Sequence, residues 1–115
     1  MAVLDRRLRA VERAHADLDL SYREVAELLR ADESTLHRWR SGESDPSPVF
    51  LDRLESLGEL LDELNQTFRD PEHARAWLYR EVPELEDHRP IDLLAEGRLE
   101  RVTAVLLALN LGAST

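Results

Sequence analysis

The stretch SYREVAELLRADESTLHRWRSG, Ser21 to Gly42, contains two short helical patterns separated by a turn. Ser21 with Glu24 three residues later has the pattern of a capping box, in which both side chains satisfy free N–H groups at a helix start. A helix is therefore predicted over residues 22–29, and RADES is a turn in which Asp32 or Ser34 caps the second helix. Gly42 fits the left-handed conformation that ends a helix.

These two helices meet the requirements of a helix-turn-helix. The second helix crosses the first at a small residue, Ala26, and apolar residues stand on the facing sides: Val25, Leu29, Leu36 and Trp39. Arginine and histidine reach guanine edges or phosphates, and serine bonds either. The DNA-binding residues predicted on the second helix are Ser34, Thr35, His37, Arg38, Ser41 and, toward a flank, Arg40. The alternative is a helical pair used only for packing or for protein contacts.

Charge divides the 115-residue chain into a neutral part and an acidic part. Residues 1–42 hold eight arginines and eight acidic residues, so the formal net charge of −9 lies in residues 43–115. The predicted DNA-binding part is therefore neutral, although the chain as a whole has the sign that DNA repels.

Composition indicates a globular protein of one domain, or of two small lobes sharing a core, because 43% of the residues are hydrophobic. There are no cysteines, which excludes disulfides and cysteine-based zinc sites. The longest apolar run, 104–109, is far shorter than the roughly 20 residues of a membrane span. The charged N-terminus does not resemble a signal peptide. We expect a cytoplasmic protein with no membrane partner.

Helical spacing continues on both sides of the central motif. Residues 2–16 carry apolar positions at Val3/Leu4, Leu8, Val11 and Ala14/His15. After the linker ESDPSP, Ser47 caps and Pro48 opens a long helix, whose stripe is Phe50, Leu54, Leu57, Leu61, Leu64 and Phe68. A long packed helix explains this stripe, and a dimer seam is the alternative. Gly58 suggests the close approach of another backbone.

The remaining segments are also helical, so the predicted fold is all-α. Asp70 caps and Pro71 opens one helix, an irregular segment follows, and Pro90 opens another. The last helix, 98–110, has Leu99, Val102, Leu106 and Leu109 on one face, and residues 102–109 are expected to pack against the long stripe.

The sequence offers no catalytic chemistry. The four histidines, His15, His37, His73 and His88, are far apart, and no glycine-rich loop precedes a helix. We expect no catalytic residue, no metal and no cofactor, and the protein is not expected to be an enzyme.

The central motif resembles the Xre-type helix-turn-helix in Arg38, Trp39 and Gly42, which a proline-containing linker follows. Two features depart from that pattern. Arg30 stands where the turn usually has glycine, so a positive φ is expected there. Asp32 and Glu33 place negative charge at the start of the recognition helix.

The C-terminal half resembles the C-terminal module of the Xre/MbcA/ParS antitoxin family. The departure is His-Arg before Pro90, where many relatives have glycine. The two resemblances together cover residues 21–112. The matching residues of the C-terminal half are Trp77, Leu78, Leu85, Pro90, Asp92, Leu93, Leu94, Gly97, Arg101, Val102 and Gly112.

The resemblance implies an antitoxin that covers the active site of a RES-domain, NAD-degrading toxin and represses its own operon. We expect three parts: a DNA-binding region (1–45), a connecting helix (46–68) and a toxin-binding module (69–115). The expected partners are the toxin, operator DNA and a second copy, in a larger assembly. One alternative is a stand-alone transcriptional regulator, and another is a structural adaptor that has lost DNA binding.

The C-terminal end is the predicted toxin-blocking segment. The resemblance places this end near the toxin's active site, and six stretched residues span about 20 Å. A frayed terminus is the alternative. The predicted toxin-binding residues are Asn110, Leu111, Gly112, Ala113, Ser114 and Thr115.

Overall fold

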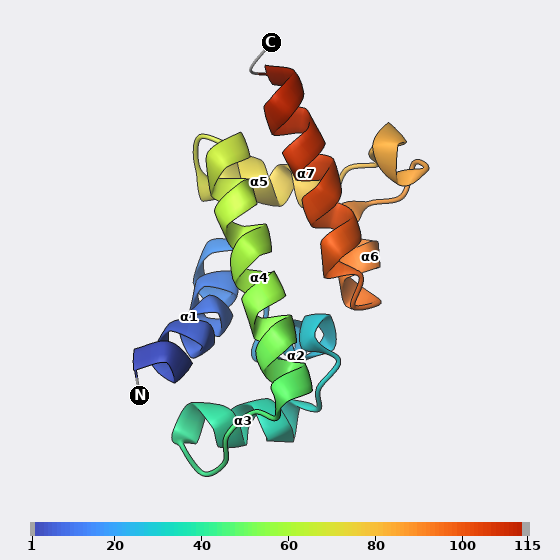
Figure 1. Ribbon diagram of the computed structural model, residues 1–115. Coiled ribbons are helices and arrows are strands. Elements are labelled where there is room, and N and C mark those ends of the chain that lie inside the picture. The colour runs from blue at the N-terminus through green and yellow to red at the C-terminus, as the bar shows by residue number, and fades with distance from the viewer. Residues whose placement is uncertain (1, 114–115) are drawn as a thin grey trace.

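The computed structural model describes the backbone of residues 2–113 and the side chains of residues 8–111. The chain is helical from end to end, with one isolated β-bridge between Val82 and His88. Figure 1 shows the helices in space. Their bounds are α1 Ala2–Asp17, α2 Tyr22–Leu29, α3 Glu33–Ser41, α4 Pro48–Thr67, α5 Pro71–Leu78, the 3₁₀ helix η1 Pro83–Leu85, α6 Pro90–Ala95 and α7 Leu99–Ala113.

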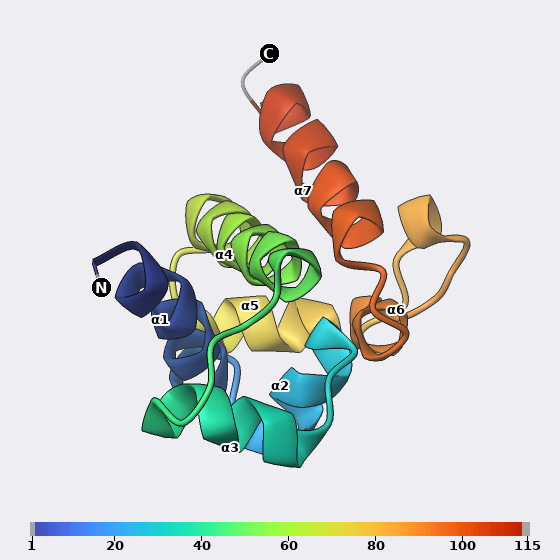
Figure 2. The same cartoon turned by 60° about the horizontal axis from the view of Figure 1, so that its bottom comes forward.

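Helix α4 is the centre of the molecule. It packs against α1 on one side and α7 on the other, with α2 and α5 along its length (Figure 2). Five leucines on its inner face are almost fully buried within the chain: Leu54, Leu57, Leu60, Leu61 and Leu64. The stripe is therefore that of a packed helix and is not exposed as a dimer seam would require.

An aromatic contact holds each end of α4. Phe50 in the first turn lies 5.0 Å from Trp39 of α3, measured between ring centroids. Phe68, the C-cap residue, lies 5.6 Å from Trp77 of α5. Both tryptophans are buried. One helix thus joins the core under α3 to the core under α5.

The predicted helix-turn-helix is present as α2 and α3. The capping box is complete, since the Glu24 N–H donates to Ser21 Oγ at 3.1 Å and the Ser21 N–H donates to Glu24 Oε1 at 2.9 Å. The predicted apolar positions are all buried: Val25, Ala26, Leu29, Leu36 and Trp39. Asp32 is the N-cap residue of α3, but its side chain makes no capping hydrogen bond.

Arginine side chains join segments that are distant in sequence. Arg53 donates to the Leu29 carbonyl at 3.3 Å, and Arg75 donates to the Asp17 carbonyl at 2.6 Å. These oxygens belong to the last residues of α2 and α1, where carbonyls lack helical partners. All fifteen basic residues of the chain are arginine, and several serve as caps for other helices.

Three expectations about packing are wrong. An added Cβ at Gly58 would meet no atom within 4 Å, so no backbone approaches there. Leu109 is 37% exposed, although its helical spacing predicted burial. Helix α7 also continues to Ala113, so residues 110–113 do not form an extended tail.

Candidate DNA-binding and partner-binding surfaces

The outer face of α3 carries most of the predicted DNA-binding residues. Leu36 and Trp39 anchor the inner face, which leaves Ser34, His37, Arg38 and Ser41 exposed and Thr35 half-buried. The Arg38 guanidinium donates to Thr35 Oγ1 at 3.1 Å, and Ser41 Oγ donates to the Arg38 carbonyl at 3.1 Å. Arg38 therefore presents a positive group on a face lined by small hydroxyl residues, which suits contact with bases or phosphates.

Arg40 has different surroundings. Its Nε donates to Glu12 Oε1 of α1 at 2.8 Å, and its guanidinium carbon lies 3.7 Å from the centre of the Tyr22 ring. The His15 ring stacks on Tyr22 with centroids 4.0 Å apart. Arg40 thus joins α3 to α1 and α2. These contacts give Arg40 a role in positioning α3, and its contact with DNA stays a prediction.

The contacts of Glu12 change two pKa values. The hydrogen bond from the Tyr22 hydroxyl, at 2.6 Å, and then the bond from Arg40 lower the pKa of the Glu12 carboxyl. The same Glu12 contact raises the pKa of Tyr22. The carboxylate is therefore held in its charged form, in which it accepts from both partners.

The second candidate surface is the face of α7 that points away from the core. The opposite face buries Leu99, Val102, Val105 and Leu106. Ala104, Leu107, Ala108 and Leu111 follow the spacing i, i+3, i+4, i+7 and are all exposed, and we call them the apolar ridge. Leu107 is 46% exposed and Leu111 71%. Figures 1 and 2 show the last turns of α7 projecting beyond the other helices.

Asn110 is tied to α4 and does not belong to a free tail. Its Nδ2 donates to Glu63 Oε1 at 2.8 Å, and its Oδ1 accepts from Thr67 Oγ1 at 3.0 Å. Leu111, a predicted toxin-binding residue, is exposed. Gly112 and Ala113 continue the helix, whereas Ser114 and Thr115 lie outside the described residues.

Sequence reasoning missed the apolar ridge because it placed residues 102–109 in the core. The signal was present, since no charged residue follows Arg101. A helix that is apolar all round has a second face to cover besides its core face. A partner surface was therefore the prediction that this composition supported.

The motif residues of the C-terminal half are structural. Pro90, Trp77, Leu93, Leu94 and Val102 are buried. Gly97 has φ +79°, and Gly42 in the helix-turn-helix has φ +81°. Two polar motif residues make contacts within the C-terminal half: Asp92 pairs with Arg89 at 2.9 Å, and Arg101 donates to the Glu84 carbonyl at 3.2 Å. These residues hold α7 in place.

The described part of the chain shows neither a cluster of metal-ligating residues nor a helix that could span a membrane. Within it, no three His, Asp or Glu side chains gather as metal ligands would. None of its helices is both long enough and apolar enough to cross a bilayer. The two faces of α3 and α7 are therefore the candidate sites.

Comparison with known proteins finds a separate domain model over each of the two surfaces. The model of the antitoxin Xre/MbcA/ParS C-terminal toxin-binding domain matches residues 63–112, and a homeodomain-like domain matches residues 1–48. The mycobacterial cidal antitoxin MbcA of Mycobacterium tuberculosis is 32% identical over 104 residues, which cover 90% of this chain and 87% of the relative. The chain belongs to the Xre/MbcA/ParS antitoxin family.

Two further comparisons agree with this membership. A probable mycobacterial cidal antitoxin of M. tuberculosis is 33% identical over 105 residues, with 89% of each chain covered. The fold matches a chain in the crystal structure of the M. tuberculosis MbcT–MbcA toxin–antitoxin complex, with a TM-score of 0.67 and 28% identity over 91% of this chain and 94% of that one. In this Xre/MbcA/ParS antitoxin, the segment matched by the toxin-binding model includes the whole apolar ridge.

Proposed function

We propose that this protein neutralises a RES-domain, NAD-degrading toxin by covering its active site, and that it represses its own operon through α3. It would act in the cytoplasm by binding and not by catalysis, as a homodimer within a larger toxin–antitoxin assembly. The observation that carries the proposal is the apolar ridge, which lies inside the segment matched by the toxin-binding family model.

The ridge has the form of a helix that docks in an apolar groove. Its positions at i, i+3, i+4 and i+7 are the anchors of that binding mode. Burying a leucine side chain contributes about 1.5–3 kcal/mol, so Leu107 and Leu111 together supply a useful part of a stable interface. The small side chains of Ala104 and Ala108 on the same face let a partner approach the helix closely.

The ridge replaces the extended tail as the proposed toxin-binding element. The acidic residues of the C-terminal part would add an electrostatic contribution to toxin binding, around the apolar contact. A cleft that receives the phosphates of NAD needs positive groups, and the net charge of −9 in residues 43–115 complements such a cleft. The described end of α7 would lie beside the cleft as a helix.

Operator binding is proposed for the outer face of α3. Arg38 is the central cation there, with His37 and the hydroxyls of Ser34 and Ser41 around it. The acidic Asp32 and Glu33 at the start of α3 weaken phosphate contacts by one chain. A dimer doubles the number of favourable contacts, and a few additional phosphate contacts raise affinity steeply at low salt.

The test co-expresses the protein with a RES-type toxin, taken from the adjacent gene where that gene encodes one, and measures growth and cellular NAD. Wild type should restore both and co-purify with the toxin. The double variant Leu107→Asp/Leu111→Asp should lose neutralisation, because charge on the ridge cannot enter an apolar groove. Val49→Asp is the matched control, since Val49 is also an exposed apolar residue (57%) but lies in the first turn of α4.

Full neutralisation by the double variant, with circular dichroism showing it folded, would reject the ridge as the toxin-binding element. No binding of an adjacent RES-type toxin by wild type would reject the antitoxin function. Promoter binding without any toxin partner would then favour the stand-alone regulator, and neither activity would favour the structural adaptor.

A further inference from the structure

Arg30 occupies a backbone conformation in which glycine is normally preferred. It ends α2 with φ 57° and ψ 41°, in the left-handed region. Its N–H bonds to the Glu27 carbonyl at 3.0 Å, and the next N–H bonds to the Ala26 carbonyl at 2.9 Å. Glycine would make the same turn without strain. We therefore expect the arginine side chain to make a stabilising contact that offsets the strain of its backbone.

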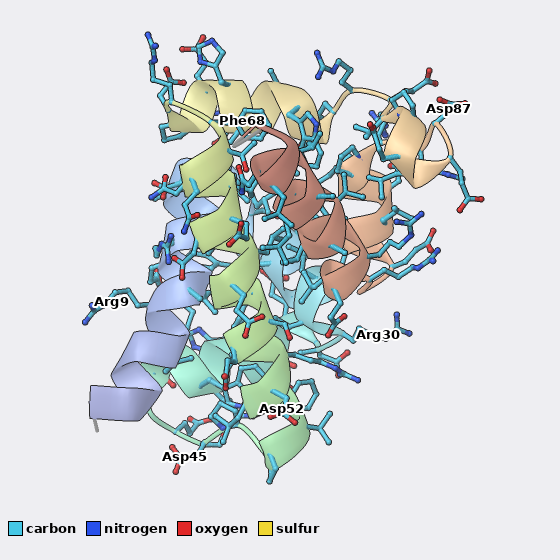
Figure 3. The ribbon with its side chains drawn as sticks, turned by 45° about the horizontal axis from the view of Figure 1, so that its top comes forward. Arg9, Arg30, Asp45, Asp52, Phe68 and Asp87 are labelled. Carbon is cyan, nitrogen blue, oxygen red and sulfur yellow. The ribbon has the colours of Figure 1, made fainter. Side chains whose placement is uncertain are left out.

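That side chain reaches the turn between α6 and α7. Arg30 Nη1 donates to the Glu96 carbonyl at 2.6 Å, across 66 positions of sequence. Gly97, the next residue, has φ +79°, and a Cβ placed there would lie 2.7 Å from both Cγ and Cδ of Arg30. The arginine stem thus fills the space that a side chain at 97 would need. Figure 3 shows Arg30 on the side of the molecule where α7 begins.

The two turns that meet at this contact each lead into a proposed binding helix. Arg30 precedes α3 by three residues, and Gly97 precedes α7 by two. Helices α2 and α6 also pack directly against each other. A displacement of α7 would therefore move the Glu96 carbonyl, and the short, charge-assisted hydrogen bond would transmit it to the turn before α3.

We propose that Arg30 is a positioning residue that couples occupation of the apolar ridge to the orientation of α3, so that toxin binding strengthens DNA binding. This inference rests on the proposed function. A partner on α7 fixes the α6–α7 turn, and Arg30 then fixes the turn before α3. Helix α3 is then already ordered before it binds DNA, so DNA binding costs less conformational entropy. Linkage requires DNA to strengthen toxin binding by the same factor.

The experiment measures dissociation constants for promoter DNA by fluorescence anisotropy, with and without a saturating concentration of the same RES-type toxin. For wild type we expect the toxin to tighten DNA binding by about fivefold or more. The coupling is the ratio of the dissociation constant for DNA without toxin to that with toxin. Arg30→Gly relieves the backbone strain but removes the hydrogen bond to Glu96, so this ratio should fall to about one. Arg30→Met keeps the stem without the donor and should give an intermediate ratio. Asp19→Gly is the matched control, because Asp19 also has a positive φ, 56°, but lies between α1 and α2.

The free chain gives a second measurement. Gly97→Ala should lower the melting temperature, and the loss should be smaller in an Arg30→Gly background because the Cβ then meets no arginine stem. An equal loss of melting temperature in both backgrounds would overturn the contact between the Arg30 side chain and Gly97. A toxin-induced ratio that is equal in wild type and Arg30→Gly would overturn the coupling while both binding activities remain. Failure of wild type to bind toxin or DNA would instead overturn the proposed function together with the coupling.

Discussion

Arg38 and Arg40 are two residues apart on α3, yet they face different surroundings. Among the described side chains, Arg38 on the outer face shares hydrogen bonds with Thr35 and Ser41. Arg40 is turned toward α1 and α2, where Glu12 and Tyr22 hold it. A rotation of about 200° around the helix axis separates the two positions, which explains why Arg40 meets α1 and α2 while Arg38 lies on the outer face.

Replacing each arginine with alanine should separate these roles. Arg38→Ala should weaken promoter binding by about 1–3 kcal/mol if the guanidinium contacts a base edge, with little change in melting temperature. Arg40→Ala should lower stability by about 1 kcal/mol, since it removes an exposed ion pair and a cation–π contact. Anisotropy titrations and thermal melts of both variants test this. The reverse pattern would place the DNA contact on Arg40.

Glu12 should make stability depend on pH in the acidic range. Its pKa is lowered in the folded state by the Tyr22 and Arg40 contacts, so its stabilising contribution is complete above the ordinary glutamate pKa, about 4.3. That contribution is lost as the pH falls through the lower, folded pKa. The melting temperature of wild type should therefore exceed that of Glu12→Gln near neutral pH, and the difference should shrink in acid. A difference that stays constant with pH would contradict the Glu12 assignment.

At the scale of the element, the sequence predicts where helices begin, because the residues that start a helix lie next to one another in the chain. Ser21 with Glu24, and the prolines at 48, 71 and 90, mark the beginnings of α2, α4, α5 and α6 as expected. The extent of α7 was not legible, because a helix that is apolar on all sides does not reveal which face meets the core. The link from Arg30 to Glu96 had no local signal, since the pair is formed only by the tertiary fold.

The end of α7 should depend on Asn110. Asn110→Ala removes two half-buried hydrogen bonds to α4, from Thr67 and to Glu63, and should reduce the free energy of unfolding by about 1 kcal/mol. Urea denaturation measures the change. Asn65→Ala on the exposed face of α4 is the control and should have little effect. An equal effect of the two variants would mean that the last turns of α7 are held by other contacts.

At the scale of the whole molecule, one core extends from α1 to α7. The buried side chains form a single cluster that α4 crosses from end to end. Sequence reasoning predicted most of its members correctly, since period and composition identify the inner faces of α2, α3 and α4. It left open whether the α4 stripe meets the same chain or a second copy, because an apolar stripe is equally suited to both.

Leu57 tests the central position of α4 in this core. It is fully buried in the middle of that helix. Leu57→Ala should therefore reduce the free energy of unfolding by about 2–5 kcal/mol, through lost burial and a residual cavity. Val49→Ala, at an exposed position of the same helix, should change it by less than about 0.5 kcal/mol. A small effect at Leu57 would show that the chain repacks easily around α4.

The aromatic contacts at the two ends of α4 make the protein its own optical probe. Trp39 and Trp77 are the two indoles of the chain, each 4% exposed and each beside a phenylalanine. Trp77→Phe leaves Trp39 in α3 as the emitter, and Trp39→Phe leaves Trp77 in α5. After each curve is scaled to its own variant's stability from circular dichroism, the red shift of fluorescence and the loss of ellipticity should coincide in both proteins if the chain unfolds as one unit. Emission from Trp77 that shifts at lower urea than the ellipticity would reveal a C-terminal part that opens while the helix-turn-helix remains folded.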